Sequence, residues 1–154
     1  MNAVDEGKPP DAALIQISER AIAFVARSGL RLRGATPGFA HCMMPLAGNE
    51  NHLGTMYAGA QFTLADITGG VLALASFDRA YFYPILKNLQ LEFLKPATTD
   101  LSLIYRITAD ELLTLQQIAE THGKAGFPLH GELLDKNGVV VTRASGEFQV
   151  RAKP

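Results

Sequence analysis

The longest apolar run in the chain extends from Tyr57 to Ser76, and Asp66 is its only charged residue. A helix that is apolar on all sides is normally buried, so we expect an almost wholly buried core helix here. Its length approaches that of a membrane span, but its polar and glycine residues and the strand-like segments around it favour a core helix. A lone buried carboxylate is unfavourable unless it is paired, hydrogen-bonded or used chemically. Asp66 is therefore either a satisfied core residue or a functional group.

Five segments have strand character, because apolar and polar residues alternate in them or apolar residues cluster between turns. The alternation is clearest at Leu89, Leu91 and Phe93, which are interleaved with polar residues. Asn137-Gly138 provides the positive φ angles of a tight hairpin between the last two strands. The segments predicted as strands are 39–46, 81–94, 101–108, 124–134 and 139–150.

Two further helices are predicted from the helical spacing of apolar residues. The first is capped by Asp11, and Arg27 in its last turn and Gly29 just beyond it mark its end. Residues 34–38, which contain two glycines and a proline, are predicted to be a loop. The second helix covers residues 109–122 and ends at a glycine.

This order of elements predicts an α+β domain. Short connections between most of the strands favour an antiparallel sheet, and such a sheet needs a cover on one face. The wholly apolar segment 57–76 is the element best suited to that role, so we predict a sheet wrapped around this helix. Residues 1–10 are expected to be a flexible tail and residues 11–154 a single domain.

Composition narrows the classes of partner. The chain has 154 residues, of which 47% are hydrophobic and only 19% are charged, and its net charge is −1. Near-neutral charge gives no reason to expect nucleic acid or an anionic membrane, and the low charged fraction suggests that part of the surface meets another subunit. The single Cys42 excludes an intrachain disulfide and fits a reducing compartment. No signal peptide is visible, so a cytoplasmic location is expected.

The segment from Asn51 to Asp66 resembles the active-site segment of the hotdog-fold thioesterases, in particular the phenylacetyl-CoA-type group. That segment runs Asn-x-x-Gly-x-x-His-Gly-Gly and continues to Leu-Ala-Asp or Leu-Ala-Glu inside the central helix. Further similarity lies in the Phe-Leu-Lys-Pro-Ala end of the second strand and in the last two strands, so the resemblance covers residues 39–150. The residues in register with the motif are Asn51, Gly54, Gly59, Leu64, Ala65 and Asp66.

More narrowly, the Gly-Thr-Met-Tyr-Ala-Gly-Ala segment and the extra helix after the third strand are similar to a subgroup of thioesterase-type proteins. That subgroup resembles the C-terminal domain of a two-domain acetyltransferase-like protein. The resemblance implies a hotdog fold and hydrolysis of an acyl-CoA or acyl-carrier thioester, with no cofactor other than the CoA of the substrate. It also implies a homodimer, or a homotetramer built as a dimer of dimers.

Two residues depart from the family motif. The family histidine, which helps to hold the thioester end of the substrate, is Tyr57 here, and the first helical glycine is Ala58. A phenol still donates one hydrogen bond but does not titrate near neutral pH. These departures do not affect the role expected for the carboxylate. They do affect which class of substrate is expected and how fast it is hydrolysed.

The chemistry of thioester hydrolysis assigns roles to the motif. Backbone N–H groups at a helix N-terminus stabilise an oxyanion, and Gly59 allows a thioester carbonyl to approach them closely. Asp66 would be the general base or the nucleophile, which the sequence does not separate. The seven residues between them span roughly 10 Å of helix, too far for both to reach one carbonyl. Two antiparallel copies of the helix would bring Gly59 of one chain near Asp66 of the other, which predicts a dimer with shared sites.

The remaining candidates are less specific. Asn51 either orients the attacking water or the thioester carbonyl, or closes an Asx turn in its loop. Gly54, Tyr57, Ala58 and Thr63 are expected around the substrate, although Thr63 is better explained by a hydrogen bond within the helix. The Gly69-Gly70 pair is better explained by close packing than by a ligand.

Two other functions are compatible with the sequence. One is a hydroxyacyl-thioester dehydratase, which would pair a histidine with the carboxylate and is disfavoured by Tyr57. The other is a non-catalytic acyl-thioester or lipid-binding module, which is disfavoured by the retention of Asp66 in an apolar helix. No metal is expected, because the four histidines and the single cysteine lack metal-ligand spacing. The histidines are His41, His52, His122 and His130.

Overall fold

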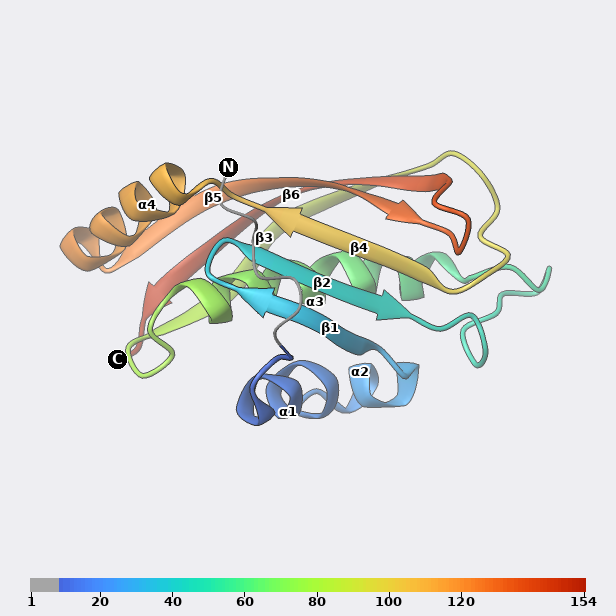
Figure 1. Cartoon of the computed structure of the whole chain (residues 1–154), viewed down its shortest axis with the longest axis horizontal. Helices are drawn as coiled ribbons and strands as arrows, with labels where there is room; N and C mark the ends of the chain where they lie inside the picture. The colour runs from blue at the N-terminus through green and yellow to red at the C-terminus, as the bar shows by residue number, and fades with distance from the viewer. Residues whose placement is uncertain (1–8) are drawn as a thin grey trace.

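A curved antiparallel sheet of six strands surrounds one long helix (Figure 1), in a computed structural model that describes residues 9–154. The strand order is β1-β2-β4-β5-β6-β3. The predicted α+β architecture, a sheet wrapped around a central helix, is confirmed. Residues 1–8 of the predicted tail lie outside the described residues. The elements are α1 (Ala12–Arg20), α2 (Ala23–Ser28), β1 (Arg31–Thr36), β2 (Phe39–Met44), α3 (Ala58–Ser76), β3 (Phe82–Phe93), β4 (Leu101–Arg106), α4 (Ala109–His122), β5 (Lys124–Leu134) and β6 (Val140–Ala152).

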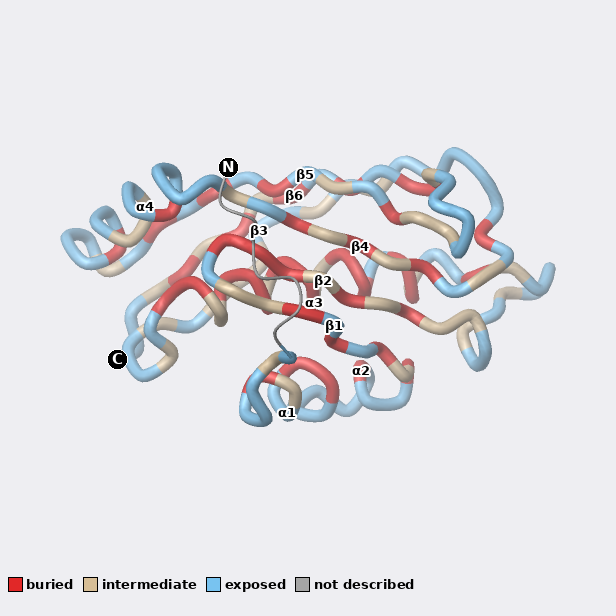
Figure 2. The backbone as a smooth tube through the Cα atoms, in the orientation of Figure 1, coloured by how far each residue is buried: buried red, intermediate tan, exposed pale blue. Residues whose placement is uncertain are grey.

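The central helix α3 is buried on the side that faces the sheet. By length and composition alone it could span a membrane, but its contacts with β2, β3 and β4 are those of a core helix, and Figure 2 shows buried residues along it. The expectation of almost complete burial is only partly correct. A row of residues spaced by four positions is exposed or half-buried, because this chain provides no second layer to cover it. The row is Ala58, Phe62, Asp66, Gly70 and Leu74.

The strand β3 forms one edge of the sheet and pairs along its other side with β6. None of its residues is fully buried, although it carries apolar side chains such as Leu89 and Leu91 that pack against the core. An edge strand leaves backbone N–H and C=O groups available for pairing with another chain. The helix α3, which carries the uncovered row, also contacts this edge strand.

The first predicted helix is two helices in the structure. Asp11 caps α1 as predicted, since its Oδ1 accepts a hydrogen bond from the Leu14 amide at 2.8 Å. The helix ends at Arg20, however, because Ile22 adopts an extended backbone before α2 begins. The break changes the direction of the chain so that Leu14 and Val25 are both buried. Helical spacing alone did not reveal it, because the spacing continues across the break.

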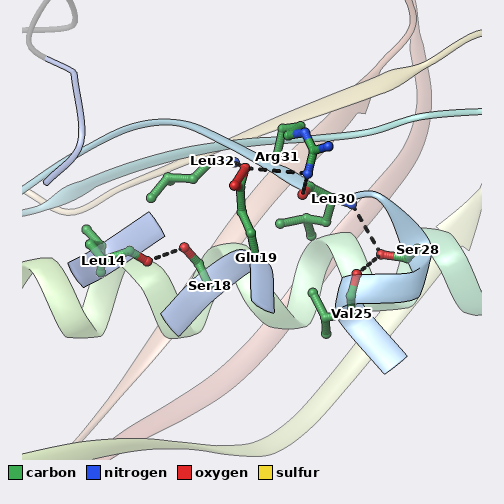
Figure 3. A network of polar contacts seen from close by, with 8 residues as sticks. All are labelled: Leu14, Ser18, Glu19, Val25, Ser28, Leu30, Arg31 and Leu32. Carbon is green, nitrogen blue, oxygen red and sulfur yellow. Dashed lines mark hydrogen bonds and ion pairs between the residues drawn. The ribbon is translucent and has the colours of Figure 1, made fainter. Parts of the chain in front are cut away.

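The strand β1 was not predicted, and part of it was assigned to the loop 34–38. It pairs with β2 through an irregularity between Leu32 and Gly34, and only residues 37–38 form the turn. Figure 3 shows how the preceding helices hold this strand: the buried Glu19 carboxylate accepts a hydrogen bond from the Leu32 amide at 3.1 Å and lies 4.0 Å from the Arg31 guanidinium. The sequence of a short edge strand interrupted by glycine shows no clear alternation of apolar and polar residues. Such a strand forms because of its contacts with other segments, here β2 and Glu19.

Packing at Gly69 holds α3 close to the sheet. A Cβ atom at this position would lie 2.2 Å from the ring of Phe148, which is buried and stacked against Phe127. We predict that Gly69→Ala lowers the free energy of unfolding by about 1–3 kcal/mol, because the added methyl group would force the buried Phe148 ring out of its packed position. Urea denaturation of the purified protein measures this change.

The adjacent glycine is a matched control. A Cβ at Gly70 would meet no atom within 4 Å, so Gly70→Ala should instead raise the free energy of unfolding by up to about 1 kcal/mol through helix propensity. Equal effects of the two substitutions would contradict the packing at Gly69.

Candidate active site

The N-terminus of α3 has two backbone amides without acceptors. Its N-cap residue, Tyr57, makes no side-chain capping hydrogen bond, and within residues 9–154 the amides of Ala58 and Gly59 donate to no acceptor. The helices α1 and α4 differ in this respect, since Asp11 and Thr108 cap them. Free amides at a helix N-terminus carry partial positive charge and can bind an anion or a developing oxyanion.

The side chain of Tyr57 crosses the start of this helix. A Cβ at Gly59 would lie 2.4 Å from Cε1 of the Tyr57 ring, so glycine is required at this position while the ring stays where it is. Tyr57 as a whole is 57% exposed. The alternative expected for Gly59, a tight helix start, therefore has a geometric basis in addition to any role in substrate binding.

The loop that contains Asn51 is held together by the Asn51 side chain. Its Oδ1 accepts hydrogen bonds from the amides of Leu53 at 2.8 Å and Thr55 at 3.2 Å, and its Nδ2 donates to the Thr55 hydroxyl at 2.9 Å. Gly54 has a φ of +82°, which favours glycine at the turn. These are the bonds of the Asx-turn alternative, and a direct role of Asn51 in catalysis stays a prediction.

Asp66 is half-buried, and no hydrogen bond or ion pair of its carboxylate is found among the described residues. Thr63, one turn earlier, donates to the Gly59 carbonyl at 2.8 Å and not to this carboxylate. This is the hydrogen bond within the helix that was expected to explain Thr63. Burial raises the pKa of Asp66 above its ordinary value of 3.8. The carboxylate is thus held in an apolar setting that makes it a stronger base than an exposed aspartate.

Three pockets surround the predicted site residues. One, of about 230 Å³, contains Asp66 and is lined by residues of α1, α3, β3 and β6 and of the break between α1 and α2. Two others, each of about 330 Å³, lie at the N-terminus of α3 against the end of β3, and one of them includes Asn51 and Lys95. The motif residues Asn51, Ala58 and Gly59 thus come together, whereas Asp66 lies about 10 Å away along the same helix. Gly54, Tyr57 and Thr63 line none of these three pockets.

Comparisons with known proteins identify the family and the fold. Residues 12–150 match the family model described as a domain of unknown function, DUF4442. A Pseudomonas aeruginosa protein of unknown function, described as a probable thioesterase, is 44% identical over 94% of this chain and 98% of its own, with a TM-score of 0.85. The chain belongs to the DUF4442 family. Its membership of the hotdog thioesterase superfamily, expected from the motif, is confirmed. A comparison with functionally curated proteins finds no match.

More distant structures share the fold of this DUF4442 protein. A Pseudomonas aeruginosa thioesterase, solved as a mutant, is 14% identical over 95% of this chain and 97% of its own, with a TM-score of 0.73. A Haemophilus influenzae thioesterase is 11% identical over 94% and 93% of the two chains, with a TM-score of 0.72. At these identities the likeness shows the fold alone.

The structure adds Tyr105, which was predicted to lie on a strand and had no assigned role. Its side chain is fully buried on β4, and among the described residues its hydroxyl has no hydrogen-bond partner. Burial and, to a lesser extent, the negative charge of Asp66 raise the pKa of Tyr105. In the sequence, the one sign of a special role was that Tyr105 continues the alternating, buried positions Leu101 and Leu103 while carrying a hydroxyl group. An ordinary core tyrosine has the same pattern.

The raised pKa of Asp66 predicts a pH-dependent effect of Asp66→Asn on stability. Because burial disfavours the charged form, the carboxyl group contributes most to stability at low pH, and this contribution is lost as the pH rises through the folded-state pKa. Asp66→Asn should therefore be more stable than the wild type at pH 7, and the difference should shrink as the pH falls towards 4. Urea unfolding of both proteins at several pH values measures it. A less stable variant at pH 7 would show that the charged carboxylate has a partner.

Proposed function

We propose that this DUF4442 protein is an acyl-CoA thioesterase. The observation that carries the proposal is the half-buried carboxylate of Asp66, which has no hydrogen bond or ion pair within residues 9–154, on the same helix as the uncapped amides of Ala58 and Gly59. The description of the 44% identical Pseudomonas aeruginosa relative as a probable thioesterase supports it. A carboxylate of raised pKa is suited to a proton transfer near neutral pH.

Each active site is shared by two chains. Within one helix, Asp66 and Gly59 are about 10 Å apart, yet an oxyanion donor and a base must each lie about 3 Å from the reacting atoms. The edge strand β3 and the uncovered row of α3 form a continuous surface on which a second copy can pair about a two-fold axis. An axis near Phe62 sets the two helices antiparallel, so that each Asp66 meets the helix N-terminus of the other chain.

The reaction follows from this arrangement. The Asp66 carboxylate removes a proton from water as the water oxygen attacks the thioester carbonyl carbon, or attacks that carbon itself to form an anhydride that water then opens. The carbonyl oxygen becomes an oxyanion held by the amides of Ala58 and Gly59. The carbon–sulfur bond then breaks. On the general-base route the CoA sulfur leaves with the proton that Asp66 took from water, whereas on the nucleophilic route the CoA thiolate leaves as the anhydride forms and takes a proton from the water that opens the anhydride. Lys95 lines the pocket beside Asn51, which supports a role for its charge in binding the anionic part of the carrier.

The two alternatives differ in what they require. A hydroxyacyl-thioester dehydratase requires a histidine near the carboxylate, and none of the four histidines lines the three pockets around the site. A non-catalytic acyl-thioester or lipid-binding module would use the same pockets without turnover. Direct assay against a panel of acyl-CoA substrates separates this module from an enzyme.

The role of Asp66 is tested by substitution. Asp66→Asn removes the base and the nucleophile while keeping the shape, so hydrolysis of a good acyl-CoA should fall by about 10²–10⁴-fold. Tyr57→Phe, a matched control at the family's histidine position, should lose only about the several-fold rate of one hydrogen bond. Release of free CoA, followed continuously, measures both variants, and the wild-type rate should rise with pH as Asp66 loses its proton. Full activity of Asp66→Asn would leave the carboxylate with a structural role and favour the binding module.

The shared site is tested by mixing two inactive variants. Asp66→Asn inactivates the base, and Gly59→Val disturbs the helix N-terminus, where even a Cβ would meet the Tyr57 ring. A mixed dimer has both defects in one site and none in the other, so co-refolded variants should recover about one quarter of the wild-type activity by random pairing. Sedimentation should show at least a dimer at micromolar concentration. A monomer, or no recovery from variants that pair, would place each site within one chain.

A further inference from the structure

Gly70 has no structural explanation within this chain. It lies in the interior of α3, where glycine is less favourable than alanine, and its φ angle is not positive. An added Cβ would meet no atom within 4 Å. The preceding Gly69 differs, since the ring of Phe148 occupies the space of its missing side chain. Close packing was expected to explain both glycines; within this chain it holds for Gly69, and for Gly70 it stays a prediction.

The open space beside Gly70 belongs to the pocket that contains Asp66. Gly70 lines this pocket of about 230 Å³ and lies four residues after Asp66, one helical turn or about 6 Å further along α3. Ile17 from α1 and Ile22 from the break after it line the pocket as well, together with Ile85 from β3. A side chain at position 70 would therefore occupy space near the carboxylate.

The lining of this pocket selects for hydrocarbon. Its polar side chains are Ser18 and Asp66, and the Ser18 hydroxyl already donates to the Leu14 carbonyl. No basic side chain lines it, so a carboxylate or another anion on the acyl group would face Asp66 without a counter-charge. Each methylene placed there should instead improve binding by about fourfold through the hydrophobic effect.

We propose that this pocket binds the uncharged hydrocarbon chain of the acyl group and that Gly70 determines how long that chain can be. The proposal rests on the thioesterase function proposed above. The pocket of about 230 Å³ has room for several methylene groups, so acyl chains longer than acetyl are the preferred substrates.

The test compares the wild type with Gly70→Ala and Gly70→Leu on straight-chain acyl-CoA substrates from two to fourteen carbons. Both new residues are good helix formers, so the helix is kept while the pocket is filled. For Gly70→Leu, kcat/KM should fall by about fourfold for each methylene that no longer fits, about tenfold or more on octanoyl-CoA. The loss should be smallest on acetyl-CoA and should grow with chain length. The chain-length profile of Gly70→Ala should lie between those of the wild type and Gly70→Leu. Ile22→Ala, at the exposed rim, should shift the optimum to longer chains.

Binding measurements separate this proposal from the proposed function. Calorimetric titration of Asp66→Asn with the same acyl-CoA series reports chain-length preference without turnover, and Gly70→Leu in that background should move the preference to shorter chains. This shift in a protein whose wild type hydrolyses no acyl-CoA would support the pocket and refute the thioesterase. An equal loss at every chain length, or dissociation of the oligomer by Gly70→Leu in sedimentation, would overturn the role of Gly70. Turnover of succinyl-CoA equal to that of butyryl-CoA would overturn the selection for uncharged acyl chains.

Discussion

The packing of α3 against the concave face of the sheet is the interaction on which the rest of the structure depends. The approach is close because Gly69 leaves its side-chain space to Phe148, and the buried Gln61 side chain fixes the register by accepting a hydrogen bond from Thr142 on β6. The same helix supplies the free N-terminal amides and the Asp66 carboxylate. The element that completes the core therefore also carries the chemical groups, and anything that moves the helix moves the site.

A helix that is apolar on every side must be covered on every side, and the sheet of one chain covers only part of it. The uncovered row from Ala58 to Leu74 includes Asp66, so the surface that calls for a second chain is also the surface that carries the carboxylate. The dimer proposed above would account for the low charged content of so small a chain. The coupling also makes the distance between Gly59 and Asp66 a constraint: one chain cannot bring the two groups together, but two antiparallel helices can.

Most of the fold could be predicted because its signals are local. Alternation marks β3, and Asn137-Gly138 marks the turn between β5 and β6. The strand β1 and the break at Ile22 were missed, because both are determined by contacts with distant segments, such as the bond from Leu32 to Glu19. The residues of the candidate site likewise fall into those that the sequence indicates and those that only the structure reveals. A single charge in an apolar run pointed to Asp66, whereas the buried hydroxyl of Tyr105 and the isoleucines of the N-terminal segment near Asp66 come together only in the folded chain.

Adjacent glycines on one helix show how position decides the meaning of a residue. Residues 69 and 70 point about 100° apart around the helix axis, so one faces the sheet and the other faces the pocket beside Asp66. In the first case glycine allows two elements to approach closely, and its unfavourable helix propensity is offset by the burial of Phe148. In the second case no contact offsets it within the chain. A residue that is unfavourable for the helix and makes no compensating contact is most simply explained by something outside the chain, and the nearest chemical group to that space is the carboxylate of Asp66.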